Sequence, residues 1–382
     1  MQIGIDICRL TDPWTGVGNY IVNLLAGLAQ VDQENDYLLY PYFPECFPRR
    51  VSDLAAFVPP QANFSLWGAN RPELLVKLLW FKLKLPQRWF LAKPAVTHST
   101  NLAGPRLPGG KLVVTVHDLS FCREPDWHKA DNVAFSLRAL EQAVAHAELL
   151  ITPSAFTAAE LTELYPQARG RVRVVPEAVL PVYRPAEDPA EVDRVKARHG
   201  LERPYLLFVG TLEPRKNLER LIAAFHQLLA GGQEDFDLVL AGGVGWKAAG
   251  IEAAIQDPAG RGRVRRLGYV PGPELPALYQ GAWALVYPSL YEGFGLPVLE
   301  ALACGTPVVT SRTASLPEVA GEAALYLDPT SQQDLLAALE RITGEPGLRA
   351  VLAARCRDQA ARFSQRAMGQ AALAVYLEAA GV

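Results

Sequence analysis

The sequence contains no uninterrupted run of about 18 uncharged apolar residues, the length that a membrane-spanning helix needs. It begins without the basic leader and long apolar segment of a secretory signal. Cysteine is scarce: the five residues are widely scattered, and no two form the close pair of a zinc or redox motif. We therefore expect a cytoplasmic protein in a reducing compartment, with peripheral attachment to the inner face of a membrane left open.

An excess of basic charge is also lacking, because 37 lysines and arginines stand against 40 aspartates and glutamates. This balance creates no field that favours nucleic acid, so any site for a polyanion has to be local. Half of the residues are hydrophobic, which is typical of a globular protein with sizeable cores. A chain of 382 residues exceeds the size at which a single core stops growing, so we expect two domains.

Short apolar runs alternate with stretches of helical spacing, a pattern typical of parallel sheets covered by helices. In the first half the predicted strands are 2–8, 37–42, 95–99, 112–117, 149–153 and 172–176, and the predicted helices include 18–30 and 132–146. The pattern then restarts with predicted strands at 205–210, 237–242, 264–269, 284–288, 307–310 and 324–327. The predicted fold class is α/β, with two Rossmann-like, doubly wound parallel-sheet domains.

A proline-rich segment separates the two patterns. Residues 176–189 contain four prolines, which disfavour helix and strand and indicate a linker. Near the end of the chain, 347–380 predicts two helices with a break near 363–365. The predicted domains are 1–180, 181–360, and a C-terminal helical segment 361–382 that crosses back to the first domain.

The most informative motif is YPSLYEGFGLPVLEALACGTP at 287–307. It lies where a predicted strand ends and a helix begins, the edge at which ligands bind in open α/β sheets. Pro297 suits the first turn of a helix, so the amides around that turn are expected to face an oxygen-rich or anionic ligand. The predicted binding residues of this loop are Gly293, Phe294, Gly295 and Leu296.

Two acids flank this loop. Glu292 is expected within it and Glu300 one turn into the helix, so they address different parts of one ligand. A carboxylate accepts two hydroxyl hydrogens at once, which suits a vicinal diol of a sugar or ribose. The alternative is an ordinary strand-to-helix turn with two solvated glutamates.

A second motif, FVGTLEPRKNL at 208–218, also follows a predicted strand and precedes a helix. It places Arg215 and Lys216 beside a helix N-terminus, where they would hold a diphosphate and stabilise its charge as it leaves. Gly210 and Thr211, at the end of the strand, are further predicted binding residues. Cations oppose the dipole at a helix start, which counts against the alternative of a solvated charge pair.

The first half offers weaker candidates. His117 stands at the end of a buried-looking strand, and spacing alone leaves a structural and a functional histidine equally open. Gly16 and Gly18 follow the first strand and open a helix, with a tight turn as the alternative. His98 is a candidate on the acceptor side, and Asp118 is expected to orient or cap the turn after His117.

Two further stretches have competing interpretations. Residues 71–93 mix six cations with four large aromatic residues, a composition that suits an anionic lipid surface, although a crossover helix with solvated lysines is the favoured alternative. Asp235-Phe236-Asp237 resembles a metal-binding Asp-x-Asp motif, but it precedes its apolar run instead of following one. We therefore predict a turn there, and no metal.

Together these motifs resemble the family-4 glycosyltransferases, and the likeness covers nearly the whole chain. The two glutamates of that family, separated by seven residues, match Glu292 and Glu300, and its cationic diphosphate site matches Arg215 and Lys216. The resemblance implies a GT-B fold, with two domains facing across a cleft, and retaining transfer from a nucleoside diphosphate sugar. It implies that Glu300 binds the donor ribose, that Glu292 lies at the donor sugar near the reacting centre, and that the amides of 294–296 bind sugar hydroxyls or phosphate.

The resemblance extends to the first half. It implies that His117 faces the donor sugar and helps to position it, and that Gly16 and Gly18 lie against phosphate or acceptor. Many members have an arginine where this chain has Thr211, which leaves Arg215 and Lys216 as the phosphate cations.

The stretches 117–121 and 210–217 are most similar to bacterial mannosyl- and rhamnosyltransferases of surface polysaccharide synthesis. We therefore expect a hexosyltransferase with GDP-mannose as the leading donor, a glycan or lipid-linked glycan as acceptor, and neither a metal nor another cofactor. A nucleotide-sugar epimerase of the same fold and a non-catalytic nucleotide-sugar-binding protein remain open as alternatives.

Overall fold

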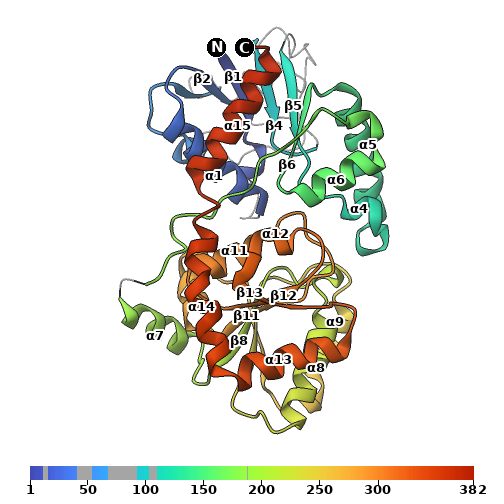
Figure 1. The fold of residues 1–382 in the computed structure, drawn as a ribbon, viewed down its shortest axis with the longest axis vertical. Helices are drawn as coiled ribbons and strands as arrows, with labels where there is room; N and C mark the ends of the chain where they lie inside the picture. The colour runs from blue at the N-terminus through green and yellow to red at the C-terminus, as the bar shows by residue number, and fades with distance from the viewer. Residues whose placement is uncertain (12–15, 41–53, 68–92, 103–109, 187) are drawn as a thin grey trace, which may run out of the picture. The chain divides into compact units, whose positions relative to one another are not determined.

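The computed structural model describes residues 1–11, 16–40, 54–67, 93–102, 110–186 and 188–382. The chain forms two compact units (Figure 1). Unit 1 comprises Met1–Leu119, Ala134–Ala178 and Phe363–Val382, and unit 2 comprises Ser120–Val133 and Val179–Arg362. The main crossings between them therefore fall at 178/179 and 362/363, where the sequence placed its domain boundaries at 180/181 and 360/361.

Unit 1 contains a parallel sheet of seven strands in the order β3-β2-β1-β4-β5-β6-β7. Its strands are β1 (Gln2–Asp6), β2 (Asp36–Tyr40), β3 (Phe64–Leu66), β4 (Val96–Ser99), β5 (Lys111–Thr115), β6 (Leu149–Thr152) and β7 (Val172–Val174). The order reverses between β1 and β4, and ligands bind at such a point, beyond the carboxyl ends of the strands.

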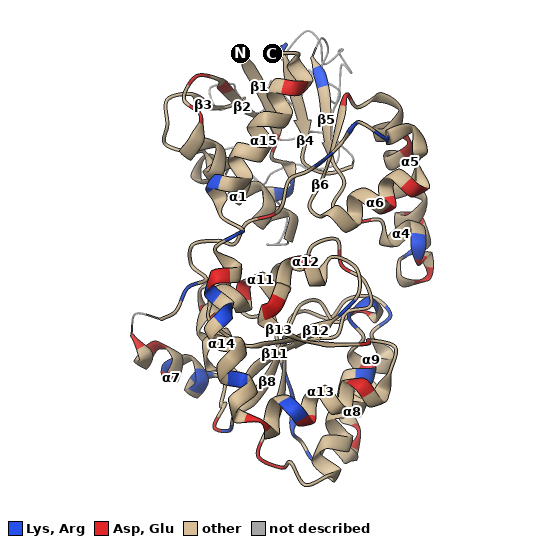
Figure 2. Cartoon of the chain, in the orientation of Figure 1, with Lys and Arg blue, Asp and Glu red and all other residues tan. Residues whose placement is uncertain are grey.

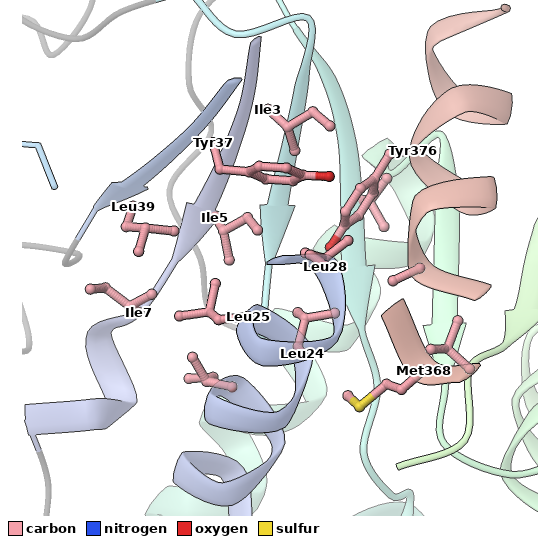
Figure 3. Packing of buried hydrophobic residues seen from close by; sticks show 14 of the residues in the cluster. Ile3, Ile5, Ile7, Leu24, Leu25, Leu28, Tyr37, Leu39, Met368 and Tyr376 are labelled. Carbon is pink, nitrogen blue, oxygen red and sulfur yellow. The ribbon is translucent and has the colours of Figure 1, made fainter. Parts of the chain in front are cut away.

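The helices of unit 1 include two from opposite ends of its sequence that lie side by side. They are α1 (Gly16–Val31) and α15 (Gln365–Ala380), which pack on each other. Two further helices are α5 (Ala130–His146) and α6 (Ala155–Leu164) (Figure 1). Figure 3 shows Leu24 and Leu28 of α1 and Tyr376 of α15 meeting the apolar side chains of β1 and β2. In Figure 2, α15 is almost free of charged residues, as expected of a helix whose surface joins a core.

Glycines allow α1 and α15 to approach closely. A Cβ added to Gly27 would lie 2.1 Å from the carbonyl oxygen of Gln365, and one added to Gly369 would lie 2.2 Å from the carbonyl carbon of Gly27. Both obstacles are backbone atoms, which cannot rotate away. The helices therefore touch backbone to backbone at this crossing.

Unit 2 contains a parallel sheet of six strands in the order β10-β9-β8-β11-β12-β13. Its strands are β8 (Tyr205–Val209), β9 (Asp237–Ala241), β10 (Val264–Gly268), β11 (Ala284–Tyr287), β12 (Val308–Ser311) and β13 (Ala324–Leu327). The order reverses between β8 and β11, which pair directly. The two motifs at 208–218 and 287–307 follow these two strands, so the fold brings them to one edge of the sheet.

The helices of unit 2 cover both sheet faces and its flanks (Figure 1). Those of seven or more residues wholly within it are α7 (Pro189–Arg198), α8 (Leu218–Ala230), α9 (Ala249–Gln256), α10 (Leu275–Gly281), α11 (Leu296–Ala303), α13 (Gln332–Gly344) and α14 (Pro346–Ala360). None of the helices that the structure describes is both long and apolar enough to cross a membrane.

The predicted fold class is confirmed, and every strand predicted above is present, with each end within two residues of its expected position. The edge strand β3 was missed, because its three residues are too few to show an alternating pattern. The two C-terminal helices and the break between them are confirmed, since α14 ends at Ala360 and α15 begins at Gln365. Residues 175–186 form neither helix nor strand, as predicted for a linker.

Candidate active site

The centre of the candidate site is a buried network around Glu292, in the loop between β11 and α11. Lys216 Nζ donates to Glu292 Oε1 at 2.6 Å, and Arg215 Nη1 donates to Glu292 Oε2 at 2.8 Å. The hydroxyl groups of Ser289 and Tyr287 also donate to Oε1, at 2.5 Å and 3.0 Å. The two motifs that were separate in the sequence therefore form one site.

Charge pairing decides the ionisation of this network. Burial by itself would raise the pKa of Glu292, but Arg215 and Lys216 outweigh it and lower that pKa to about 2. Burial and the adjacent Arg215 lower the pKa of Lys216, while Glu292 opposes that shift. Glu292 is thus a fixed carboxylate at neutral pH and cannot serve there as a general acid.

Arg215 has a second carboxylate partner that the sequence did not reveal. Its Nη2 donates to Glu213 Oε1 at 2.9 Å, and its Nη1 donates to the carbonyl oxygen of Tyr291 at 2.9 Å. Glu213 is only 4 % exposed. The two cations and the two carboxylates of Glu213 and Glu292 balance in formal charge, which explains how four charged groups share a buried position.

The loop before α11 has a fixed shape. Gly295 has φ of 111°, a left-handed conformation that favours glycine, and a Cβ there would lie 2.8 Å from Cδ2 of Leu316. Ser315 Oγ lies 2.9 Å and 2.8 Å from the carbonyl oxygens of Glu292 and Phe294. Gly293 and Phe294 are buried in this loop and Leu296, the first residue of α11, is half-buried; Pro297 stands in the first turn, as predicted.

Glu300 lies in a different environment from Glu292. It is 6 % exposed, its Oε2 accepts a hydrogen bond of 2.7 Å from the hydroxyl of Tyr279, and Tyr183 also donates to it. Burial raises the pKa of Glu300 to about 7, although both tyrosine bonds act in the opposite direction. The two glutamates therefore differ in protonation as well as in partners.

The end of β8 supplies the remaining predicted residues of unit 2. Gly210 has φ of 148°, and a Cβ on the neighbouring Gly242 would lie 1.9 Å from the carbonyl oxygen of Gly210. Thr211 is exposed beside it. The glycines thus let the two loops after β8 and β9 touch.

In unit 1, His117 follows β5 and both of its ring nitrogens have partners. Nε2 lies 2.9 Å from the carbonyl oxygen of Thr100, and Nδ1 lies 3.4 Å from Glu177 Oε1. The ring of Tyr20 meets the imidazole edge-on, with centroids 4.8 Å apart. Gly18 is buried and Gly16 is exposed, both in the first turn of α1.

His98 is a structural residue, which corrects its candidacy on the acceptor side. It is fully buried; Nδ1 lies 2.7 Å from the hydroxyl of Tyr376, and Nε2 lies 2.8 Å from Thr115 Oγ1. Burial, helped by the charge of His117, lowers the pKa of His98 to about 3, so it is neutral.

The two stretches with competing interpretations have different outcomes. Residues 71–92, which hold nearly all of the basic aromatic stretch, lie outside the described residues. Asp235 lies in a turn, as predicted, and Asp237 opens β9 with an ion pair of 3.2 Å to Arg263. Within the described part of the chain, no group of three or more His, Cys, Asp or Glu side chains is arranged to hold a metal ion.

Several residues of these networks were missed in the sequence: Glu177, Glu213, Tyr183, Tyr279, Tyr287 and Ser289. Glu213, Tyr287 and Ser289 lie inside the two motifs, Tyr183 and Glu177 lie in the linker region, and Tyr279 lies in α10. No spacing rule identifies any of them as a partner of the predicted residues.

Comparisons with known proteins show the family of this chain. Residues 14–181 match the family model "Glycosyltransferase Family 4", and residues 190–361 match "Glycosyl transferases group 1". O-antigen chain mannosyltransferase B of Escherichia coli is 33% identical over 360 residues, which cover 92% of this chain and 93% of that protein. This chain therefore belongs to the family-4 glycosyltransferases and is a glycosyltransferase.

Solved structures show the same fold. HepE from Anabaena in complex with UDP-glucose has a TM-score of 0.72 at 16% identity, covering 98% of this chain and 99% of that one. Sucrose-phosphate synthase from Thermosynechococcus elongatus has a TM-score of 0.71 at 20% identity, covering 99% and 98%. The fold is GT-B.

Proposed function

We propose that this glycosyltransferase moves mannose from GDP-mannose to a hydroxyl group of a glycan or lipid-linked glycan, with retention of anomeric configuration. The proposal that mannose is the donor sugar is supported by the 33% identity to an O-antigen mannosyltransferase along almost the whole chain. A role in surface polysaccharide synthesis rests on the same relative. Neither an epimerase nor a silent binding protein has such support.

In the proposed reaction the bond between the sugar C1 and the diphosphate oxygen breaks while a bond from C1 to the acceptor oxygen forms on the same face. The acceptor proton passes to the departing phosphate oxygen. Arg215 and Lys216, held together by Glu292 at 2.8 Å and 2.6 Å, balance the charge of the leaving diphosphate. Glu292, fixed as a carboxylate, orients these cations beside the donor sugar, and we propose no metal and no covalent enzyme intermediate.

A screen of nucleotide sugars by thermal unfolding tests the donor. GDP-mannose at about 100 times its Kd should stabilise the protein by about 2.7 kcal/mol, a rise of several degrees in Tm. UDP-glucose and UDP-N-acetylglucosamine serve as controls and should give smaller shifts. A shift with one of these and none with GDP-mannose would refute the donor, and an inverted anomeric signal in the NMR spectrum of the product would refute retention.

The pH dependence of donor binding tests the role of Glu300 at the ribose. Hydroxyl groups donate to the carboxylate, and burial holds the pKa of Glu300 at about 7, so protons compete with the ligand below that pH. We expect the Kd of GDP-mannose, measured by calorimetry, to fall about tenfold between pH 6 and pH 8 and to level off above pH 7.

Tyr279→Phe is the matched variant for this measurement. It removes a hydrogen bond that lowers the pKa of Glu300, so the transition should move to higher pH. A Kd that stays constant from pH 6 to pH 8 in the unaltered protein would exclude Glu300 from nucleotide binding.

A further inference from the structure

The carboxylate of Glu177, next to His117 in unit 1, has one paired oxygen and one open oxygen among the described residues. Its side chain is 7 % exposed, and Oε1 faces His117 Nδ1 at 3.4 Å. Its second oxygen, Oε2, is buried and has no hydrogen-bond partner among the residues that the structure describes. Buried polar atoms in folded proteins are nearly always paired, so an open carboxylate oxygen indicates a ligand or water that donates a hydrogen bond.

The backbone around Glu177 is fixed against α1. Asn23 Nδ2 donates to the carbonyl oxygen of Ala178 at 2.7 Å, and the amide of Val175 donates to the carbonyl oxygen of Thr152 at 2.9 Å. Both neighbours of the Pro176-Glu177 dipeptide are therefore anchored to unit 1. The position of the carboxylate is set by the fold and not by a free linker.

A second buried acceptor without a partner among the described residues lies on α1. Asn19 Oδ1 is also buried without a hydrogen-bond partner in the described chain. Asn19 precedes Tyr20, whose ring contacts His117, and it stands one turn before Asn23, on the same face of α1. Open, buried acceptors in this part of unit 1 match a ligand that carries several hydroxyl donors, as a sugar does.

The groups around His117 favour its charged form. Burial alone would lower the pKa of His117, but Glu177, the carbonyl of Thr100 and the charge of Asp118 outweigh it and raise that pKa. From α1 the ring of Tyr20 faces the imidazole, and its hydroxyl is paired with Thr115 at 2.9 Å. The buried His98 nearby is neutral.

We propose that Glu177 belongs to the reaction site: one oxygen holds His117 in place as an imidazolium, and the other accepts a hydrogen bond from a sugar hydroxyl. The proposal rests on the proposed function and deepens it. The hydroxyl belongs either to the donor sugar or to the acceptor sugar, and the experiment below separates the two. Toward His117, Glu177 acts as a positioning residue.

The first test is an NMR titration of the histidine ring signals, with His117→Gln to assign the signal of His117. In the unaltered protein, His117 should titrate above its ordinary pKa of 6.5. Glu177→Gln keeps the shape but removes the charge, so the midpoint should fall by about one pH unit or more. Glu177→Asp should retain part of the shift, and Glu148→Gln, an exposed carboxylate of unit 1 paired with Lys111, should leave it unchanged.

The second test is steady-state kinetics of Glu177→Gln with GDP-mannose as donor and methyl α-mannoside as acceptor. Losing a hydrogen bond to a charged group should raise one KM about tenfold to 100-fold. A raised KM for methyl α-mannoside, with unchanged hydrolysis of GDP-mannose in its absence, assigns the hydroxyl to the acceptor. A raised KM for GDP-mannose with slower hydrolysis assigns it to the donor.

The outcomes separate this inference from the proposed function. If the unaltered protein neither binds nor hydrolyses GDP-mannose, the proposed donor is wrong, and the titration of His117 alone decides the role of Glu177. If Glu177→Gln leaves that titration unchanged, or if it is folded by thermal unfolding and keeps both KM values and kcat, the inference is overturned.

Discussion

Lys216→Gln should lower kcat by about two to three orders of magnitude, the effect seen when one charge-stabilising group is removed from an active site. Lys216 is buried, and its ammonium group donates to Glu292 at 2.6 Å and to the hydroxyl of Tyr287 at 2.7 Å. Glutamine keeps a hydrogen-bond donor but removes the charge that would balance the leaving diphosphate. Single-turnover measurement of transfer from GDP-mannose gives the change in the chemical step.

The Kd of GDP-mannose and two control variants show whether the loss of kcat in Lys216→Gln comes from the chemical step. The Kd of GDP-mannose should weaken far less than kcat falls, because Arg215 remains at 2.8 Å from Glu292. Lys216→Arg preserves the charge and should recover part of the rate, and Lys111→Gln, an exposed lysine paired with Glu148, is the matched control. A kcat for Lys216→Gln within about threefold of the unaltered protein would remove Lys216 from the proposed mechanism.

Gly27→Ala should destabilise unit 1 by about 3 kcal/mol or more, because the new methyl group has no space. Its Cβ would lie 2.1 Å from the carbonyl oxygen of Gln365 and 2.9 Å from the amide nitrogen of Gly369, so α1 and α15 must separate. The corresponding fall in Tm is several degrees or more, measured by scanning calorimetry, which also resolves the two units if they unfold separately.

Gly347→Ala is the matched control for this change. Gly347 lies in α14, is exposed, and has nothing within 4 Å of an added Cβ. Alanine there should stabilise the helix by about 0.5–1 kcal/mol through its higher helix propensity. If Gly27→Ala and Gly347→Ala gave the same Tm, the close crossing of α1 and α15 would not exist in solution.

The fold was predictable from the sequence because it depends on local patterns. Buried parallel strands are continuous apolar runs, and the residue that ends each run marks the carboxyl edge of a sheet. Glu292, Arg215 and Lys216 could be found for that reason, since all three follow such runs. The edge strand Phe64–Leu66 lacks this pattern and was not predicted.

The partners of the site residues were not predictable in the same way. His98 lies near the end of β4 and His117 just beyond the end of β5, its neighbour in the sheet. Their positions relative to the strand ends did not separate a structural histidine from a functional one. Their difference arises from Tyr376, almost 280 positions away from His98 in the chain, which occupies one ring nitrogen of His98. Glu177, which faces His117, stands 60 positions later in the chain.

The sequence also predicted the cations of unit 2 but not their counter-ions. Arg215 and Lys216 were expected to bind a diphosphate. A buried cation without a ligand needs a carboxylate, and Glu213 and Glu292 take that place. In the proposed mechanism the diphosphate therefore binds to cations whose orientation is set beforehand.

The return of α15 to unit 1 has a consequence for biosynthesis. The core of unit 1 needs Met368 and Tyr376, which leave the ribosome after all of unit 2 has been made. Residues 179–362 of unit 2 can begin to pack while translation continues. The surface of α1 around Gly27, which α15 covers in the finished fold, stays uncovered until α15 has been made. Unit 1 therefore completes its fold after unit 2, although most of it is synthesised first. During translation its apolar core surface stays exposed for longer, so it is the more prone of the two units to aggregate.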